Sequence, residues 1–553
     1  MQIDLEKSPV RSTFQSTVCV VGAGIAGLLL ARQLANSGVD VHLLEAGGLE
    51  LEIRSQKLYN VQMGGRLHKG ATEGRFRVFG GSSTRWGGQL LAFAPDIFVP
   101  APGTPSGSWP VTATDLQGYY AELDKILHLP GRVPDEELLK LARLEPEEPG
   151  AEVDIRFSKW LPFSKRNMAN TIGSECLNNK QVSVFLHANV TSIEANKITG
   201  RIERIVAKNY NGRCYEFFAK QFVICAGTIE TNRLLLASRT PSECGLGNTH
   251  DQVGRYFHDH ISVAAATVTG KARREFVRSF SPLLVKGILH TPKLEASPRL
   301  REEQKLLAVM GHFAIEEPDG SGVASVREFL QRWQQGEGAG QLPGFVANLP
   351  RTFAELAKMA WCTQVYKRRA ISNRATITLR LDMEQLPAAD RRIKLSADRD
   401  VLGMPRAIVD WNISEVEHRT AQVYARVAGR YLQRLGVSPL RWNSALWDPG
   451  EAWLEFTRDT YHAMGGTRMG TDPRKSVVNE NLRVHGIPNL FVASCSVFPG
   501  GGSSNPTFTL LALALRLGDH LTKLSQAPAV TYRSDLTRPA EPVHASAHLS
   551  VGK

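Results

Sequence analysis

The chain has 553 residues, of which 42% are hydrophobic and 22% charged, the balance of an ordinary soluble globular protein. This length exceeds what one hydrophobic core supports, so at least two domains or lobes are expected. The formal net charge is +12, but the basic residues form short scattered groups without interleaved aromatic residues, which excludes nucleic acid as an expected partner.

The cysteine pattern and the first residues indicate the compartment. Seven cysteines are an odd number without a C-x-x-C pair, and Cys19 and Cys225 lie in apolar, strand-like runs. Reduced, buried thiols are therefore expected instead of a disulfide frame or a zinc site. The first residues include neither an apolar core segment nor a twin arginine, and the apolar run 18–34 contains glycines and Arg32. We expect a cytoplasmic protein without membrane association.

The first motif is VCVVGAGIAGLLLARQLANSGVDVHLLEAGG. It predicts a buried strand at residues 18–21, a glycine turn, a helix at 25–36 and a second strand at 41–44 that ends at Glu45. This order is typical of a dinucleotide-binding unit, and the acid is positioned to bind the adenosine ribose hydroxyls. An acid there disfavours a 2′-phosphate, so NADP is not expected; the motif alone does not distinguish NAD from FAD.

The three glycines of this motif have different expected tasks. Gly22 makes the tight turn, Gly24 lets the backbone approach a pyrophosphate, and Gly27 permits close packing of the helix on the strand. The free N–H groups of the helix N-terminus, at Ile25 and Ala26, favour the negative charge of that pyrophosphate.

A second glycine-rich segment, GRFRVFGGSSTRWGGQLLAF, spans residues 74–93. It predicts a second backbone cradle with hydroxyl donors and a flat apolar wall, whereas a plain surface loop would not explain a tryptophan held between glycines. A nicotinamide enzyme has no evident need for two cradles, but the longer FAD molecule does. The expected contacts are Gly80, Gly81, Ser82, Ser83, Trp86 and Gly87.

Further elements follow along the chain. Residues 109–127 predict a helix that opens with a capping box between Thr114 and Gln117. VSVFLHANVTSIEA alternates as a strand does, and residues 223–238 read as strand, turn and helix. Residues 316–369 are helix-like with loops and match no motif, and the polar tail from Ala527 is expected to be disordered.

The two histidines of FHDH are candidate metal ligands. On a strand, His258 and His260 would share one face. No third ligand is suitably spaced, so no metal is expected. His485, in VHG, is expected to be structural.

Four blocks resemble the glucose-methanol-choline (GMC) oxidoreductase family: GAGIAG with Glu45, GGSSTRWGG, VICAGTIETNRLLLAS, and the C-terminal stretch from HAMGGTRMG to NLFVASCSVFPGGGSSNPTFTLLALALRLGDHL. They lie at the start, middle and end of the chain, so the resemblance covers its whole length. The segments VGRYFHDH and SVFPGGGSSNPTFT most resemble the branch of pyranose oxidases and bacterial glucoside 3-dehydrogenases.

The resemblance implies an α/β fold, α+β overall. A Rossmann-like FAD-binding domain is assembled from three chain segments, and a substrate-binding domain contains an antiparallel sheet and helices. The expected FAD-binding parts are residues 1–96, 181–250 and 456–525, the substrate-binding parts are 97–180 and 251–455, and the tail is 526–553.

The resemblance also implies individual contacts with FAD. Val190 corresponds to a valine that contacts adenine, and Ser494 stands where many members have aspartate near the FAD phosphates. Pyranose oxidases bond their flavin covalently through a histidine where this chain has Arg85, so non-covalent FAD is predicted. The other cofactor residues implied are Ala226, Gly227, Pro506 and Thr507.

His462 and Asn505 match the family's paired residues at the reactive face of the flavin. Each also has a structural interpretation. Asn505 could cap a helix at residues 507–521 with Pro506 at its first position, and His462 could be a hydrogen-bonded loop residue. The family spacing favours a catalytic pair in which His462 accepts the hydroxyl proton of an alcohol and Asn505 donates its amide N–H to the developing oxyanion.

The expected function is therefore that of an FAD-dependent dehydrogenase. It would transfer hydride from a secondary alcohol of a sugar, glycoside or polyol to flavin N5. The alternatives are an oxygen-using alcohol oxidase of the same family, an FAD-containing lyase, and a redox-silent FAD-binding protein. The sequence does not identify the sugar or alcohol, the electron acceptor or the oligomeric state.

Overall fold

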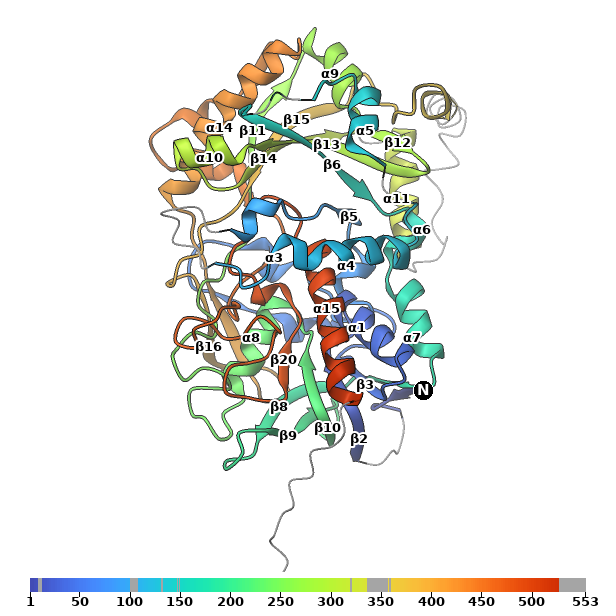
Figure 1. Ribbon diagram of the computed structural model, residues 1–553, viewed down its shortest axis with the longest axis vertical. Coiled ribbons are helices and arrows are strands. Elements are labelled where there is room, and N and C mark those ends of the chain that lie inside the picture. Colours follow the sequence, from blue (N-terminus) through green and yellow to red (C-terminus); the bar gives the residue numbers. More distant parts are fainter. Residues whose placement is uncertain are drawn as a thin grey trace, which may run out of the picture.

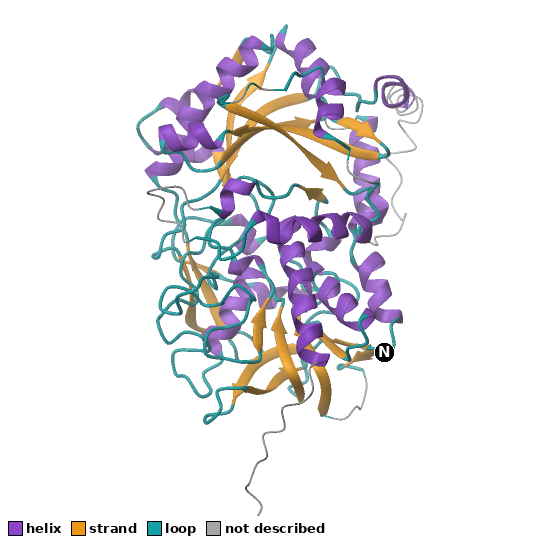
Figure 2. Ribbon diagram, in the orientation of Figure 1, coloured by secondary structure: helices purple, strands orange, loops and turns teal. Residues whose placement is uncertain are grey.

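The computed structural model describes residues 1–7, 12–99, 108–130, 133–146, 148, 150–318, 321–335, 357 and 360–526. In Figure 1, one sheet lies in the lower half of the molecule and a second sheet arches across the upper half. Helices pack against both sheets, as the colouring in Figure 2 shows. Within the described part of the chain, no helix combines the length and apolarity needed to cross a membrane.

The lower sheet has eight strands, of which six are parallel, as expected for a Rossmann-like unit. Its centre is apolar on both faces, which explains why Val18, Val20, Val41 and Leu43 are fully buried. The strands are, in spatial order, β1 (Gln2–Asp4), β7 (Val182–Leu186), β3 (Val41–Leu44), β2 (Thr13–Val21), β10 (Cys214–Ile224), β9 (Ile202–Lys208) and β8 (Asn189–Ala195), with β20 (Leu490–Val492) also paired to β10.

Helices α1 (Ile25–Asn36) and α15 (Thr507–Gln526) pack against each other beside this sheet (Figure 1). Both bury leucine and alanine side chains in the core that contains the sheet. α8 (Gly227–Ala237) follows β10 directly. The expected strand, turn and helix at residues 223–238 are therefore confirmed, as are the expected ranges of α1 and β3.

The upper sheet has nine strands, and all its neighbours are antiparallel. One face is apolar and belongs to the same hydrophobic cluster as α14 (Glu415–Arg434), and the alternate residues face the other way. The strands are β18 (Leu440–Trp442), β11 (Ile261–Val268), β15 (Thr376–Met383), β14 (Val309–Glu316), β13 (Ile288–Ala296), β6 (Val153–Trp160) and β5 (Gln89–Leu90), with β12 (Leu283–Val285) on β13 and β19 (Thr457–Asp459) on β11.

The second face of the upper sheet is polar and holds the glycine loop that precedes α15. Glu295, on β13, accepts a hydrogen bond from the hydroxyl of Ser503. Glu384, directly after β15, accepts from the backbone N–H groups of Gly501 and Gly502, at 3.0 and 3.3 Å. The upper sheet therefore fixes the backbone immediately before Asn505.

A three-stranded sheet and several shorter helices complete the fold. Its strands are β16 (Arg392–Arg399), β17 (Pro405–Asp410) and β4 (Gln62–Met63). The remaining α-helices of the described residues are α2 (Ile53–Gln56), α3 (Lys69–Thr72), α4 (Ala113–Ile126), α5 (Asp135–Ala142), α6 (Phe163–Arg166), α7 (Ser174–Asn178), α9 (Ala272–Phe280), α10 (Pro298–Gln304) and α11 (Gly322–Gln334).

At three places the structure differs from the sequence-based expectation or does not describe the residues. The capping box of α4 is formed by Thr112 and Asp115, so the predicted pair was wrong and the helix begins at Ala113. The stretch 182–195 is two strands, β7 and β8, separated at His187 by a positive φ of 54°. The tail from Ala527 and much of 316–369 lie outside the described residues. The domain boundaries stay a prediction.

Candidate active site

The glycine turn between β2 and α1 borders an open space. A Cβ at Gly22, where φ is +100°, would lie 2.7 Å from the carbonyl oxygen of Cys225, and one at Gly27 would lie 1.9 Å from that of Gly22. A Cβ at Gly24 would meet no protein atom within 4 Å. Gly22 and Gly27 are thus required by packing, whereas Gly24 leaves room beside the helix N-terminus for a ligand.

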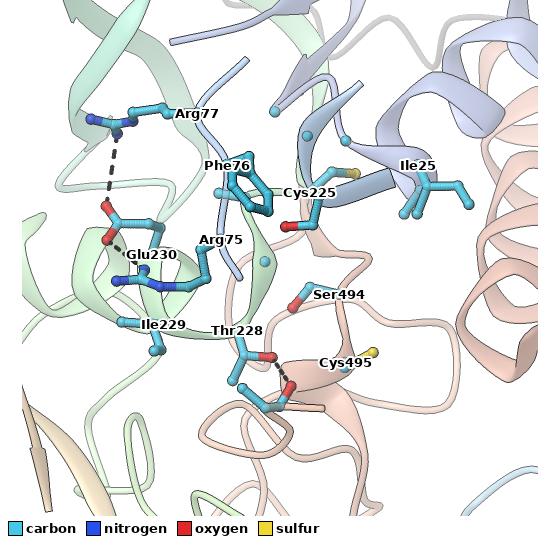
Figure 3. Close-up of a pocket in the computed structure, with 18 of the residues that line it drawn as sticks. Ile25, Arg75, Phe76, Arg77, Cys225, Thr228, Ile229, Glu230, Ser494 and Cys495 are labelled. Atoms are coloured by element: carbon cyan, nitrogen blue, oxygen red, sulfur yellow. Dashed lines mark hydrogen bonds and ion pairs between the residues drawn. The ribbon is translucent and has the colours of Figure 1, made fainter. Parts of the chain in front are cut away.

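That space is a cavity lined by residues from the start, middle and end of the chain (Figure 3). Of the expected cofactor residues, it is lined by Gly22, Gly24, Ile25, Ala26, Glu45, Gly81, Ser82, Ser83, Val190, Ala226, Gly227, Ser494, Pro506 and Thr507, and also by His462. Gly27, Gly80, Trp86, Gly87 and Asn505 lie outside this lining.

Glu45 lines the cavity directly after β3. Its two carboxylate oxygens accept hydrogen bonds from the backbone N–H groups of Ala23, at 3.1 Å, and Gly47, at 2.8 Å. Burial raises the pKa of Glu45 above its ordinary value, and the two N–H groups oppose this effect. The acid is held rigidly against the glycine turn.

The second glycine segment lies directly against the first. The N–H of Gly80 donates to the carbonyl of Ala23 at 2.9 Å, and a Cβ at Gly81 would lie 3.0 Å from Cα of Gly24. The hydroxyl of Ser83 donates back to Gly80, which tightens the turn. Trp86 instead turns its indole N–H to the carbonyl of Arg166, at 2.7 Å.

A charged cluster in the same cavity was not predicted from the sequence. Arg75 and Arg77 lie 3.4 and 3.8 Å from the carboxylate of Glu230, and both guanidinium groups stack on the ring of Tyr59 (Figure 3 shows the arginines and Glu230). Burial favours the neutral acid, but the charge of Arg233 followed by those of Arg77 and Arg75 lowers the pKa of Glu230. The available signal was the pair of arginines in GRFR, directly before the glycines.

His462 and Asn505 meet beside the cavity. Nδ2 of Asn505 lies 3.2 Å from Nε2 of His462. The helix α15 begins at Thr507, and the carbonyl of Pro506 accepts its first hydrogen bond, from Leu510. Asn505 is therefore not the capping residue of this helix, and its amide is directed to His462.

Burial is the main cause that lowers the pKa of His462 to about 4, and the neighbouring His260 adds to it. The ring is consequently neutral at physiological pH. A neutral imidazole with a lone pair beside an amide donor is equipped to accept a proton.

The residues around His462 correct the interpretation of FHDH. Strand β11 begins only at Ile261, so His258 and His260 do not share a strand face. His258 contacts the carbonyl of Tyr256, whereas Nδ1 of His260 lies 3.0 Å from Nδ1 of His462. His260 was not predicted as a site residue, because 202 positions separate the two histidines in the sequence.

Asp259 holds the backbone of the same loop. Its Oδ1 accepts hydrogen bonds from the N–H groups of Thr460 and His462, and its Oδ2 lies 3.1 Å from Nε2 of His68. Burial opposes ionisation, but the hydrogen bond with His68 lowers the pKa of Asp259. With Asp459, these residues form the one cluster of metal-ligand type among the described residues. The carboxylate oxygens of Asp459 accept hydrogen bonds from the backbone N–H groups of Lys69 and Gly70, and the absence of a metal stays a prediction.

His485 contacts Ser476 and the carbonyl of Gly470, as a structural histidine does.

The cavity fits a dinucleotide. Its lining combines an open Gly24, a helix N-terminus, a buried acid and a neutral histidine. A ligand that contacts all of these groups needs an adenosine half and a second, reactive half, which is the construction of FAD.

Comparisons with known proteins agree with this fit. Residues 17–242 match the family model for FAD dependent oxidoreductases, and residues 387–514 match that for GMC oxidoreductases. A 2-methyl-1,2-propanediol dehydrogenase of Mycolicibacterium austroafricanum is 25% identical, over 93% of this chain and 96% of that protein. The fructose dehydrogenase large subunit of Gluconobacter japonicus is 23% identical, over 92% and 98%.

Among solved structures, a pyridoxine 4-oxidase from Mesorbium loti superposes with a TM-score of 0.57 at 16% identity, covering 91% of this chain and 99% of that one. At this identity the likeness concerns the fold alone, and it confirms mixed helices and sheets with a Rossmann-like unit. The chain is therefore an FAD-dependent oxidoreductase whose residues 387–514 match the GMC oxidoreductases.

Proposed function

We propose that this oxidoreductase removes hydride from a secondary alcohol of a sugar, glycoside or polyol, with His462 as the base and Asn505 as the amide donor. The observation that carries the proposal is the 3.2 Å contact between the two side chains beside the cavity. The names of the two full-length relatives, a diol dehydrogenase and a fructose dehydrogenase, support a hydroxylated substrate.

The proposed chemistry follows from the charges of the site. An alcohol gives up hydride readily only when its hydroxyl proton leaves before or during the transfer. His462 is a neutral base because its pKa is lowered to about 4. Nε2 would accept the proton, and the amide N–H of Asn505 would donate to the resulting oxyanion. FAD, when bound, supplies the acceptor for the hydride.

The polar face of the upper sheet supplies groups suited to the other hydroxyls. His312, on β14, lies 2.8 Å from the carboxylate of Asp382, on β15. Lys293, on β13, is 4% exposed, and burial lowers its pKa to about 8. Asp382 and Lys293 both influence the charge of His462, so the cluster lies near the base. Donors and acceptors close together are suited to a polyol.

Anaerobic mixing of the His462→Ala variant with a panel of sugars, glycosides and polyols tests the proposal. The variant is expected to keep its FAD but to lose flavin bleaching by roughly 10²-fold to 10⁴-fold relative to the unmodified enzyme, the contribution of a general base. His250→Ala, at an exposed turn residue, is the control and is expected to bleach normally. Normal bleaching of His462→Ala would remove His462 from the mechanism.

A further inference from the structure

His260 and Thr460 both face the same nitrogen of His462. Nδ1 of His462 lies 3.0 Å from Nδ1 of His260 and 2.8 Å from Oγ1 of Thr460. The rings of the two histidines meet edge to face, at 83°. Only one proton can occupy Nδ1 of a neutral imidazole, so its partners decide whether that proton is present.

The protonation of His260 is determined by its other nitrogen. Nε2 of His260 lies 3.0 Å from the carbonyl oxygen of Gly501, which only accepts hydrogen bonds. Nε2 must therefore carry the proton, and Nδ1 of neutral His260 is left as an acceptor. An acceptor 3.0 Å from Nδ1 of His462 requires that His462 be the donor.

Thr460 leads to the same result independently. Its hydroxyl lies 3.1 Å from Oδ1 of Asp259, whose carboxylate only accepts, so the hydroxyl proton points there. The oxygen of Thr460 is then an acceptor towards Nδ1 of His462. Two separate series of hydrogen bonds, one through His260 to the carbonyl of Gly501 and one through Thr460 to the carboxylate of Asp259, thus both require a proton on Nδ1 of His462.

We propose that His260 and Thr460 are positioning residues that hold His462 in the Nδ1–H tautomer, so that its lone pair lies on Nε2 beside the amide of Asn505. The inference rests on the proposed function of His462 as the base. When Nε2 accepts the hydroxyl proton, the Nδ1–H remains in place, and the carboxylate of Asp259 behind Thr460 stabilises the new imidazolium charge. In this acid–base step the proton moves from the substrate oxygen to Nε2 of His462, and the O–H electron pair stays on the substrate oxygen.

Nitrogen NMR of the FAD-loaded enzyme with ¹⁵N-labelled histidine tests the tautomer directly, with His462→Gln used for assignment. The expected spectrum shows a protonated Nδ1 and an unprotonated Nε2 for His462. A double variant, His260→Phe with Thr460→Val, removes both acceptors and is expected to shift His462 towards the Nε2–H form. An Nε2–H signal in the unmodified enzyme would overturn the inference.

Rates of anaerobic flavin reduction supply the second test. His260→Phe is expected to be slower by about tenfold at saturating substrate, the equivalent of one hydrogen bond, with little change in the substrate concentration for half-saturation. His260→Asn places an acceptor oxygen where Nδ1 was and is expected to restore most of the rate. If His260→Asn is as slow as His260→Phe, His260 acts by packing alone.

Controls separate this inference from other failures. FAD content and melting temperature are measured for each variant, and His250→Phe, at an exposed turn, is the matched control. If His260→Phe does not fold, the NMR spectrum of the unmodified enzyme and the rate of His260→Asn still decide. If His462→Ala reduces its flavin normally, the proposed function fails, whatever tautomer the spectrum reports.

Discussion

The side-chain amide of Asn505 lies 3.2 Å from Nε2 of His462, although 43 positions separate the two residues. The helix that follows begins at Thr507, and its first backbone hydrogen bond is accepted by the carbonyl of Pro506. The amide of Asn505 is therefore left to contact His462. Asn505→Ala is expected to retain FAD and lose roughly 10²-fold in the rate of flavin reduction, as for the loss of one oxyanion donor. Stopped-flow measurement under nitrogen checks this, with the exposed Asn211→Ala as control. An unchanged rate would contradict the role of the amide.

The acidic limb of the pH profile reports on the base. Burial, with a contribution from His260, lowers the pKa of His462 to about 4, and a base works only when unprotonated. The kcat/KM value of the free enzyme is therefore expected to rise with pH through about 4 and to stay level towards neutrality. A limb near the ordinary histidine value of about 6.5 would show that the burial effect is absent.

The alkaline limb is expected to report on Lys293, whose pKa burial lowers to about 8. Its ammonium is charged below that pH and can donate to a substrate oxygen, and it loses this ability above it. The value of kcat/KM should fall as pH rises through about 8, and Lys293→Met should abolish that limb. A limb that persists in the variant belongs to another group.

Gly24 allows the cofactor fit to be tested without disturbing packing. Its φ of −71° suits any residue, and a Cβ there would project into open space. Gly24→Ala is expected to fold and to bind FAD at least about tenfold more weakly, a loss of ~1.4 kcal/mol. Fluorescence titration of the apoenzyme measures the affinity. Gly118→Ala, whose Cβ also meets no atom within 4 Å, serves as control and should bind FAD normally.

The arginine at position 85 predicts that FAD is bound without a covalent bond to the protein. The guanidinium of Arg85 lies over the ring of Phe76, 5.2 Å from its centroid, and arginine does not form the histidyl bond of pyranose oxidases. Precipitation with acid should release all flavin absorbance into the supernatant. Colour that remains with the pellet would demonstrate a covalent bond.

Elements determined by local pattern were predictable. The ranges of α1 and β3 agreed residue for residue with the prediction, because apolar period and glycine positions act over a few residues. The capping box of α4 was not, because VTATDLQ offers two overlapping Thr-x-x-polar pairs. The sequence alone does not decide between the pair Thr112 and Asp115 and the pair Thr114 and Gln117. The structure shows that the first pair caps the helix.

Contacts between distant segments set the limit of sequence reasoning at the site. His462 and Asn505 could be paired because both lie in motifs that resemble those of the GMC family. His260 could not, since its partner is 202 positions away and its neighbour in sequence, His258, suggested a strand that does not form. The ion pair between Arg75 and Glu230 spans 155 positions and was equally invisible.

The two carboxylates that hold the glycine loop also limit how the molecule can move. Glu295 and Glu384 attach residues 501–503 to the upper sheet, while α15, a few residues later, is packed on α1 beside the lower one. Asn505 thus lies between two anchored segments, the loop held by the upper sheet and the helix α15 packed on α1. A separation of the two sheets would therefore strain the backbone that holds this amide beside His462.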